Sequence, residues 1–343
     1  MKIIHIIYSF YTGGAEAMLV DILNEQSKTE DVELIIVNNL YNPDLVKKVQ
    51  SQIKIHYINR VEGSFNIMDI LRLNLLLYRY RPDIIHLHNH RLIWLIKYKA
   101  KIYLTIHDVN VPAKGYNKVD KVFSISNAVK LNILMRGGPD STLVYNGIDF
   151  GKFETKTNYK LQNKFKIVQV SSLIHLKKGQ HTLLEALNYL VHQKNISNIS
   201  VDFIGEGTSL DYLKDMTKKL NLEKHVNYLG LKDRDFIYKT LYMYDLLVQP
   251  SFYEGFGLTV IEGIAAGLPV IVSNIDGPSE IVQGLPAGLT FETGNVDSLV
   301  KALLLIMQLY EENRIKQLVD ESYDKAFTKF SVQTTAQNYI NNY

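Results

Sequence analysis

The chain has 343 residues, of which 46% are hydrophobic and 21% are charged, as in an ordinary globular protein. It contains no cysteine, which excludes a disulfide framework and a zinc site built on thiolates. The net charge of +3 is too small to indicate a nucleic-acid partner. The length favours two domains, because one hydrophobic core rarely serves so many residues.

The opening segment and the apolar runs bear on where the protein works. The segment MKIIHII is too short for a signal peptide and is typical of a buried strand. No apolar run approaches the roughly 18 residues that span a bilayer. We therefore expect a soluble, cytoplasmic protein, with a peripheral position on the inner face of the plasma membrane as the alternative.

The first half of the chain alternates β-branched runs with helical periods, which cover residues 15–26 and 67–80. Such alternation is typical of a parallel sheet with helices on both faces. The runs expected to form strands are residues 2–8, 33–37, 54–58, 83–87, 102–106 and 122–125.

The pattern breaks between residues 147 and 166, where the sequence is polar and irregular. We therefore predict a linker near residues 153–164 between two doubly wound α/β domains. A final helix within residues 327–343, with Ser331 as its N-cap, could pack on either domain. The second series of strands is expected at residues 166–170, 200–204, 226–228, 246–249, 269–272 and 289–291.

Two loops of the first domain are candidates for a site, because ligands of such sheets bind beyond the carboxyl ends of the strands. Gly13 and Gly14 precede a helix whose amides attract phosphate, although paired glycines also occur in simple tight turns. No third glycine completes a dinucleotide-binding fingerprint. His107 ends another strand and is either a hydrogen-bond or proton donor in the crevice or a structural histidine.

Three further histidines invite a metal interpretation. His86, His88 and His90 alternate at strand spacing, so their side chains are expected to share one face. A zinc ion needs a further ligand and an orienting shell, and nothing nearby in the sequence clearly supplies them. We therefore expect histidines that are buried or line the crevice, and no metal.

The second domain offers weaker candidates after its first two strands. Ser172 and Lys178 follow the first of them, and a lysine before a helix suits a diphosphate, although an ordinary solvated lysine is the alternative. Gly205 and Glu206 follow the next strand in a Gly-Glu-Gly segment. This segment lacks the third glycine of a cofactor fingerprint, since residue 210 is leucine.

The most informative segment lies where a buried strand ends and a helix begins. Glu254 lies in the loop, and Glu262 lies one turn beyond Leu258 on the same helical face. Two carboxylates repel phosphate, but they suit the hydroxyls of a sugar and of a ribose on either side of it. A phosphate cradle that needs no metal is expected at Gly255, Phe256, Gly257 and Leu258.

Two other patterns have competing interpretations. Asp233-Arg234-Asp235 has the spelling of a metal-binding motif, but either aspartate also suits a helix N-terminus, which we favour. The basic residues between Arg72 and Lys101 follow or interrupt an apolar helical period that includes Ile67, Ile70, Leu71 and Leu75. They indicate either the solvated face of a core helix or a surface that contacts anionic lipid.

These segments, in this order, resemble the retaining glycosyltransferases of family 4, which have the GT-B fold. The resemblance covers nearly the whole chain, and its specific part is Glu254 and Glu262 with seven residues between them. Corroborating segments are Gly-Gly-Ala-Glu at 13–16, Asn-Gly-Ile-Asp at 146–149, Lys-Gly at 178–179, Gly-Leu-Pro-Val at 267–270 and Gly-Pro-Ser-Glu at 277–280.

The resemblance implies two Rossmann-like domains that face a deep cleft. Residues 1–157, together with a crossing helix at 327–343, are expected on the acceptor side, and residues 158–326 are expected to bind the donor. In this arrangement Glu262 holds the ribose and Glu254 the transferred sugar. Lys178 and the amides around Gly257 and Leu258 hold the diphosphate. On the other side, Gly13 and Gly14 approach the diphosphate and His107 contacts the donor sugar.

The implied activity is transfer of a hexose or N-acetylhexosamine from a nucleotide sugar to a glycan or a lipid-linked saccharide, with retention and without a metal or other cofactor. A UDP-sugar is the favoured donor and a GDP-sugar the main alternative. A GT-B epimerase and a non-catalytic sugar-binding protein are the alternatives to a transferase. Ser172 departs from the family, which usually has an arginine there, so weaker donor binding is expected unless His175, Lys177 or Lys178 compensates.

Overall fold

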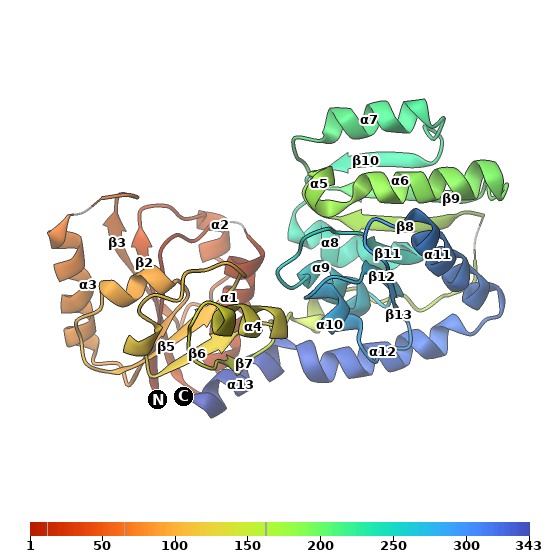
Figure 1. Cartoon of the computed structure of the whole chain (residues 1–343). Helices are drawn as coiled ribbons and strands as arrows, with labels where there is room; N and C mark the ends of the chain where they lie inside the picture. The colour runs from red at the N-terminus through yellow and green to blue at the C-terminus, as the bar shows by residue number, and fades with distance from the viewer. Residues whose placement is uncertain (12, 65, 162) are drawn as a thin grey trace. The chain divides into compact units, whose positions relative to one another are not determined.

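The computed structural model describes residues 1–11, 13–64, 66–161 and 163–343, and its chain forms two compact units (Figure 1). Unit 1 comprises Met1–Ile148 and Phe330–Tyr343, and unit 2 comprises Asp149–Lys329. The boundaries expected after residues 157 and 326 fall near these divisions.

Unit 1 is built on a sheet whose strands are all parallel, in the order β3-β2-β1-β4-β5-β6-β7. Six of the strands confirm the predicted runs, and β7 was missed because two residues show no periodicity. The strands are β1 (Lys2–Ile7), β2 (Asp31–Asn38), β3 (Lys54–Arg60), β4 (Ile84–Leu87), β5 (Lys101–Ile106), β6 (Lys121–Ser124) and β7 (Thr142–Leu143).

The helices of unit 1 include one from the far end of the sequence. Tyr339 of that helix, α13, shares a buried cluster with Ile3 of β1, Met18 of α1 and Phe123 of β6. Ser331 caps α13, because its Oγ accepts a hydrogen bond of 3.3 Å from the amide of Thr334, as predicted. The helices are α1 (Gly14–Gln26), α2 (Pro43–Val46), α3 (Ile67–Tyr80), η1 (His90–Trp94), η2 (Tyr116–Lys118), α4 (Asn127–Met135) and α13 (Val332–Asn342).

Unit 2 has a second parallel sheet, in the order β10-β9-β8-β11-β12-β13. All its strands confirm predicted runs. They are β8 (Phe165–Val170), β9 (Ile199–Ile204), β10 (Val226–Gly230), β11 (Leu246–Gln249), β12 (Val270–Ser273) and β13 (Gly288–Phe291).

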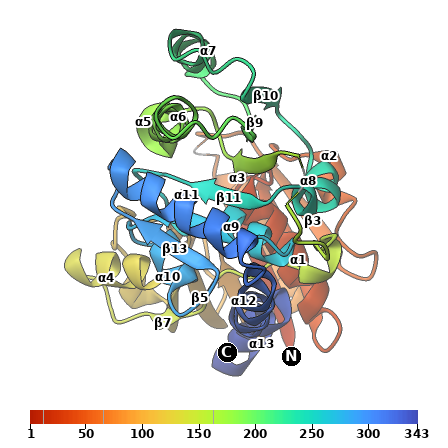
Figure 2. The ribbon, with the colours of Figure 1, turned by 90° about the vertical axis from the view of Figure 1, so that its right-hand side faces the viewer.

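The helices of unit 2 complete its core, and α6 and α11 lie side by side there (Figures 1 and 2). Leu183 and Leu187 of α6 and Leu303 of α11 are buried in one cluster with strand residues. The helices are η3 (Phe150–Lys152), α5 (His175–Lys178), α6 (Gln180–Asn188), η4 (Tyr189–Gln193), α7 (Leu210–Lys219), α8 (Arg234–Thr240), η5 (Leu241–Met243), α9 (Leu258–Ala265), α10 (Pro278–Val282), α11 (Val296–Glu311) and α12 (Ile315–Phe330).

The segment expected to be a linker is irregular, but much of it packs on unit 2. The ring of Phe153 lies edge-on to Tyr238 at a centroid distance of 4.8 Å. Lys156 Nζ lies 3.0 Å from Asp245 Oδ1, and both side chains are 10% exposed. These contacts explain why the compact unit begins earlier than the polar sequence suggested.

Helix α3 packs on the core through a different face from the one that the sequence predicted. Ile67, Leu71 and Leu75 are 69%, 49% and 66% exposed, whereas Leu73 and Leu77 are buried. The helix does pack on the core, and Ile70 is partly buried, but the prediction is wrong for Ile67, Leu71 and Leu75, which form an apolar stripe on the outer face of α3. No helix in the described ranges is long and apolar enough to cross a membrane.

Candidate functional site

Each sheet has one place where its strand order reverses, between β1 and β4 in unit 1 and between β8 and β11 in unit 2. Crossover helices leave such a position toward opposite faces, so a crevice remains beyond the carboxyl ends of the strands. The predicted site residues all follow strands and form two sets. Gly13, Gly14 and His107 belong to unit 1, and the remainder belong to unit 2.

In unit 2 the loops after β8 and β11 dock against each other. Gly179 has a φ of +69°, and a Cβ on it would lie 1.8 Å from the carbonyl oxygen of Pro250. The amide of Phe252 donates a hydrogen bond of 2.9 Å to the carbonyl of Lys177. Only glycine permits this close approach with a positive φ, so the Lys-Gly pair positions its lysine beside the second loop.

The docked loops join two of the predicted residues, Lys178 and Glu254. Lys178 Nζ forms an ion pair with Glu254 Oε2, and the two side chains are 12% and 18% exposed. Gln249 and Ser251 also donate to this carboxylate oxygen, at 3.4 and 3.5 Å. The ammonium group is therefore held in a fixed place at the strand-order reversal.

Helix α9 begins at Leu258, directly after Gly257, which has a φ of +105°. The first amides of a helix have no carbonyl partner within it and carry partial positive charge. Gly255 and Gly257 flank Phe256, whose side chain is 4% exposed. Phe256 therefore anchors the loop through its ring, and a ligand could meet this segment through its backbone.

Glu262 has a partner that the sequence interpretation missed. Its Oε1 accepts a hydrogen bond of 2.8 Å from Arg234 Nη2, and the Glu262 side chain is 6% exposed. Asp233 Oδ1 caps α8 by accepting from the amide of Phe236 at 2.7 Å, so the N-cap interpretation of this segment is confirmed. The sequence did contain a signal for Arg234, because it lies between Asp233 and Asp235, the two aspartates considered above as a possible metal-binding motif.

Gly205 and its neighbours have a packing role. A Cβ on Gly205 would lie 2.0 Å from the carbonyl oxygen of Ser171, and the amide of Leu173 donates to the carbonyl of Glu206 at 2.9 Å. The glycine thus lets the loops after β8 and β9 touch. The Ser172 and Glu206 side chains are exposed at this place.

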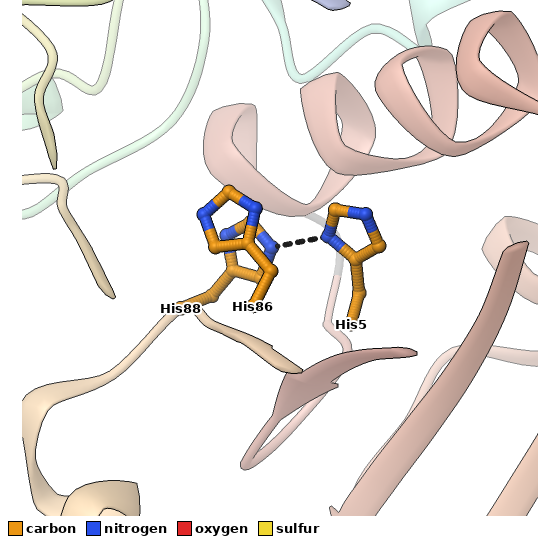
Figure 3. Close-up of side chains that lie close together, drawn as sticks. All are labelled: His5, His86 and His88. Atoms are coloured by element: carbon orange, nitrogen blue, oxygen red, sulfur yellow. Dashed lines mark hydrogen bonds between the residues drawn. The ribbon is translucent and has the colours of Figure 1, made fainter. Parts of the chain in front are cut away.

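In unit 1 His5, His88 and His107 form one hydrogen-bonded chain, and His86 lies beside it; Figure 3 shows His5, His86 and His88. His5 Nδ1 lies 2.9 Å from His88 Nε2, and His88 Nδ1 lies 3.2 Å from His107 Nε2. His5 Nε2 lies 2.8 Å from Gln26 Oε1. His86 bonds separately to the hydroxyls of Tyr343 and Thr105.

The direction of these hydrogen bonds follows from Gln26. A carbonyl oxygen can only accept, so His5 Nε2 carries the proton and His5 Nδ1 accepts. His88 and His107 then each donate through Nε2. This leaves His107 Nδ1 unprotonated, and it has no hydrogen-bond partner among the described residues.

The histidine prediction was correct for two residues and wrong for the third. His86 and His88 do share a face, with ring centroids 4.6 Å apart. His90 does not join them, because β4 ends at Leu87 and His90 begins η1. His5 takes its place through the pairing of β1 with β4.

These three histidines could also be arranged around a metal, since they offer nitrogens within 4.8 Å of one another (Figure 3). The His5 and His88 nitrogens that face each other are, however, already joined by a hydrogen bond. A metal ion held by these nitrogens would have to replace the hydrogen bond between His5 and His88. It would also have to replace the bond of His5 to Gln26 or the bonds of His86 to Tyr343 and Thr105. The donor set therefore favours a hydrogen-bonded network.

Burial keeps this network neutral. Desolvation lowers the pKa of His5 and of His107 to about 4. Burial, together with repulsion from neighbouring histidines, lowers the pKa values of His86 and His88 well below the usual value. His107 is thus a neutral hydrogen-bonding group at physiological pH, and it is a poor proton donor.

Comparisons with known proteins give a consistent result. The family model "Glycosyltransferase Family 4" matches residues 12–152, and "Glycosyl transferases group 1" matches residues 152–320. An uncharacterized glycosyltransferase of Methanocaldococcus jannaschii is 26% identical over 59% of this chain, and the match spans 53% of that protein.

One further relative and one solved structure match over almost their whole length. The N-acetylgalactosamine-N,N'-diacetylbacillosaminyl-diphospho-undecaprenol 4-alpha-N-acetylgalactosaminyltransferase of Campylobacter jejuni is 24% identical over 97% of this chain and 98% of its own. The crystal structure of Anabaena HepE in complex with UDP and glucose has a TM-score of 0.78 at 20% identity. It covers 100% of this chain and 99% of that one, which shows a shared fold.

The neutral histidines predict an acid-sensitive unit 1. Below about pH 6.5 the unfolded chain protonates its histidines, whereas His5 in the folded chain stays neutral until about pH 4. The unfolded state therefore binds more protons in this window, and the free energy of unfolding falls as the pH falls from 6.5 to 4. Urea denaturation, followed by the fluorescence of Trp94, the sole tryptophan, measures this in unit 1.

His5→Gln removes one titrating group and should lower the slope of this free energy by roughly 1.4 kcal/mol per pH unit. His192→Gln, at an exposed histidine of unit 2, should leave the slope unchanged. Equal slopes for the parent and His5→Gln would contradict the proposed protonation states.

Proposed function

Because the chain belongs to the glycosyltransferases described by these two family models and has their GT-B fold, we propose that it transfers a hexose or N-acetylhexosamine from a UDP-sugar. The acceptor is a glycan or lipid-linked saccharide, the anomeric configuration is retained, and no metal takes part. The observation that carries the proposal is a pair of carboxylates, each held by a cation. Glu254 lies before the start of α9 and pairs with Lys178, and Glu262 lies within α9 and pairs with Arg234.

The donor roles follow from these contacts. The Glu262 carboxylate keeps lone pairs for ribose hydroxyls while Arg234 fixes its orientation. Glu254 serves hydroxyls of the transferred sugar. The diphosphate lies between them, on Lys178 and on the amides at Gly257 and Leu258. UDP is favoured over GDP as the nucleotide, and the neighbour whose structure contains UDP and glucose supports this choice.

The chemistry needs no nucleophilic side chain. The bond between the anomeric carbon and the phosphate oxygen breaks, and the nucleoside diphosphate leaves with its electron pair. The acceptor hydroxyl attacks the same face, and its proton passes to the departing phosphate oxygen. Lys178 and the first turn of α9 stabilise the growing negative charge in the place of a metal. His107, neutral and held by His88, is suited to a hydrogen bond with a sugar hydroxyl.

The acceptor belongs to the biosynthesis of a surface polysaccharide. The Campylobacter relative, by its name, extends a saccharide carried on diphospho-undecaprenol, which supports a lipid-linked acceptor here. Such a substrate keeps its lipid in a bilayer, so an enzyme that uses it benefits from a cytoplasmic position at the membrane surface.

Helix α3 supplies a surface suited to that position. Ile67, Leu71, Leu75 and Tyr78 lie on one outer face and are 49–69% exposed. Arg72 and Arg79 border this stripe and are exposed as well. An apolar stripe flanked by cations suits anionic headgroups, which supports the lipid-contact interpretation of this face.

A donor panel tests the central proposal. Slow hydrolysis and binding of UDP-sugars and GDP-sugars are measured with and without EDTA, and NMR identifies the anomer that is released. We expect one UDP-sugar to be hydrolysed to the retained anomer at the same rate in EDTA. Loss of activity in EDTA would refute the metal-free mechanism. Preference for GDP-sugars would refute the donor, and release of an isomerised sugar nucleotide would indicate an epimerase.

Glu262→Ala should weaken UDP binding by about tenfold or more, since a charged hydrogen-bond acceptor for the ribose is lost. Isothermal titration with UDP measures the effect. Glu223→Ala removes an exposed carboxylate of the same unit and should bind UDP like the parent. If Glu262→Ala also binds UDP like the parent, while melting as a folded protein, the ribose assignment is wrong.

The double variant Leu71→Glu/Leu75→Glu should abolish flotation of the protein with vesicles that contain phosphatidylglycerol. A matched control is Leu131→Glu/Leu134→Glu on α4, whose leucines are 58% and 42% exposed on the same unit. The control should float like the parent. Equal loss of flotation in both double variants would contradict the assignment of α3. Equally strong flotation of the parent protein with vesicles of pure phosphatidylcholine would contradict it as well.

A further inference from the structure

Unit 1 contains a cavity of about 670 Å³ beyond the carboxyl ends of its strands. Tyr8 after β1, Asn38 at the end of β2, Arg60 at the end of β3, His88 after β4 and His107 after β5 all line it. The cavity thus lies at the strand-order reversal between β1 and β4, where α/β sheets bind ligands.

Arg60 is held rigidly in the wall of this cavity. Its Nη1 donates to Asn38 Oδ1 at 3.0 Å, and its Nη2 donates to the carbonyl of Ser64. The guanidinium carbon lies 5.8 Å from the centre of the Tyr8 ring. The partners are all neutral, so the contacts fix the position of the charge and leave it uncompensated.

Several other partly buried cations of the chain have a carboxylate as partner, whereas the hydrogen-bond partners of Arg60 are neutral. Lys2, Lys156, Lys178 and Arg234 each form an ion pair with a carboxylate. Among the described residues no ion pair is found for Arg60, which is partly buried, or for Arg91, an exposed arginine that also lines the cavity. A partly buried charge without a partner is costly, and a bound anion would remove that cost.

The two guanidinium groups act on the same phenol. Burial raises the pKa of Tyr8, and the charges of Arg60 and Arg91 oppose this rise. The Tyr8 hydroxyl therefore adds a neutral donor to the cavity that both cations line. Two acids also line the cavity, Glu16 and Glu62. Glu62 is exposed, and burial raises the pKa of Glu16 from its ordinary value.

We propose that Arg60, Arg91 and Tyr8 form an oxyanion site that binds a phosphate group of the acceptor. Guanidinium groups match phosphate because they offer paired donors in a plane. The word "acceptor" rests on the proposed transferase function, whereas the phosphate site itself rests on unit 1 alone. The acceptor is thus a phosphorylated saccharide, with its reacting hydroxyl away from this anchor.

Pyrophosphate binding in the presence of saturating UDP tests the site, because UDP occupies the diphosphate site of the donor. Titration calorimetry on the full chain should detect binding of inorganic pyrophosphate. The variants Arg91→Gln and Arg60→Gln/Arg91→Gln should weaken it by about tenfold or more. Arg136→Gln, at an exposed arginine outside the cavity, serves as the matched control and should bind like the parent.

The possible results separate this proposal from the transferase proposal. The phosphate site is overturned if Arg60→Gln/Arg91→Gln binds pyrophosphate with the same affinity as the parent protein. It is also overturned if the parent protein does not bind pyrophosphate. Binding of glucuronate in place of pyrophosphate would also overturn it and would indicate a carboxylate. If UDP itself fails to bind, the donor assignment fails, and the same arginine variants still decide the phosphate site in the absence of UDP. Parental urea denaturation of the variants, followed by the fluorescence of Trp94, shows that unit 1 is folded.

Discussion

The arrangement of this protein depends on one topological constraint, the reversal of strand order in each parallel sheet. Because parallel strands need right-handed crossovers, helices on either side of the reversal leave toward opposite faces of the sheet. The carboxyl ends of β1 and β4, and of β8 and β11, are therefore left open. In unit 1 this opening is the cavity lined by Arg60 and His107. In unit 2 it is the place where Lys178 meets Glu254.

The strands were predictable because a parallel sheet buries both of its faces, which leaves continuous β-branched runs in the sequence. The loops that position the site were less predictable from the sequence. The contact of Lys178 with Glu254 depends on Gly179 fitting under the carbonyl of Pro250, which no local pattern reveals. Arg234 was passed over because its partner, Glu262, lies on another helix.

Strand register and helix orientation account for the remaining differences. His5 and His86 become neighbours through the pairing of β1 with β4, and a sequence pattern does not contain that register. For α3, the periodicity indicated an amphipathic helix, but apolar residues occur on two of its faces. Burial of Leu73 and Leu77 decides which face meets the core, and only the packed structure supplies that information.

The serine at position 172 changes which groups of the protein stabilise the negative charge of the diphosphate in the proposed mechanism. A diphosphate brings more negative charge than Lys178 can match, since this lysine already neutralises Glu254. Hydrogen bonds to a charged group contribute about 1.5–3 kcal/mol each, and a helix N-terminus contributes about 0.3–1 kcal/mol, rising to about 2 kcal/mol when partly buried. Without an arginine at position 172, the first turn of α9 carries a larger share of the stabilisation. That turn begins directly after the left-handed Gly257, so the proposal makes the start of α9 a main determinant of donor binding.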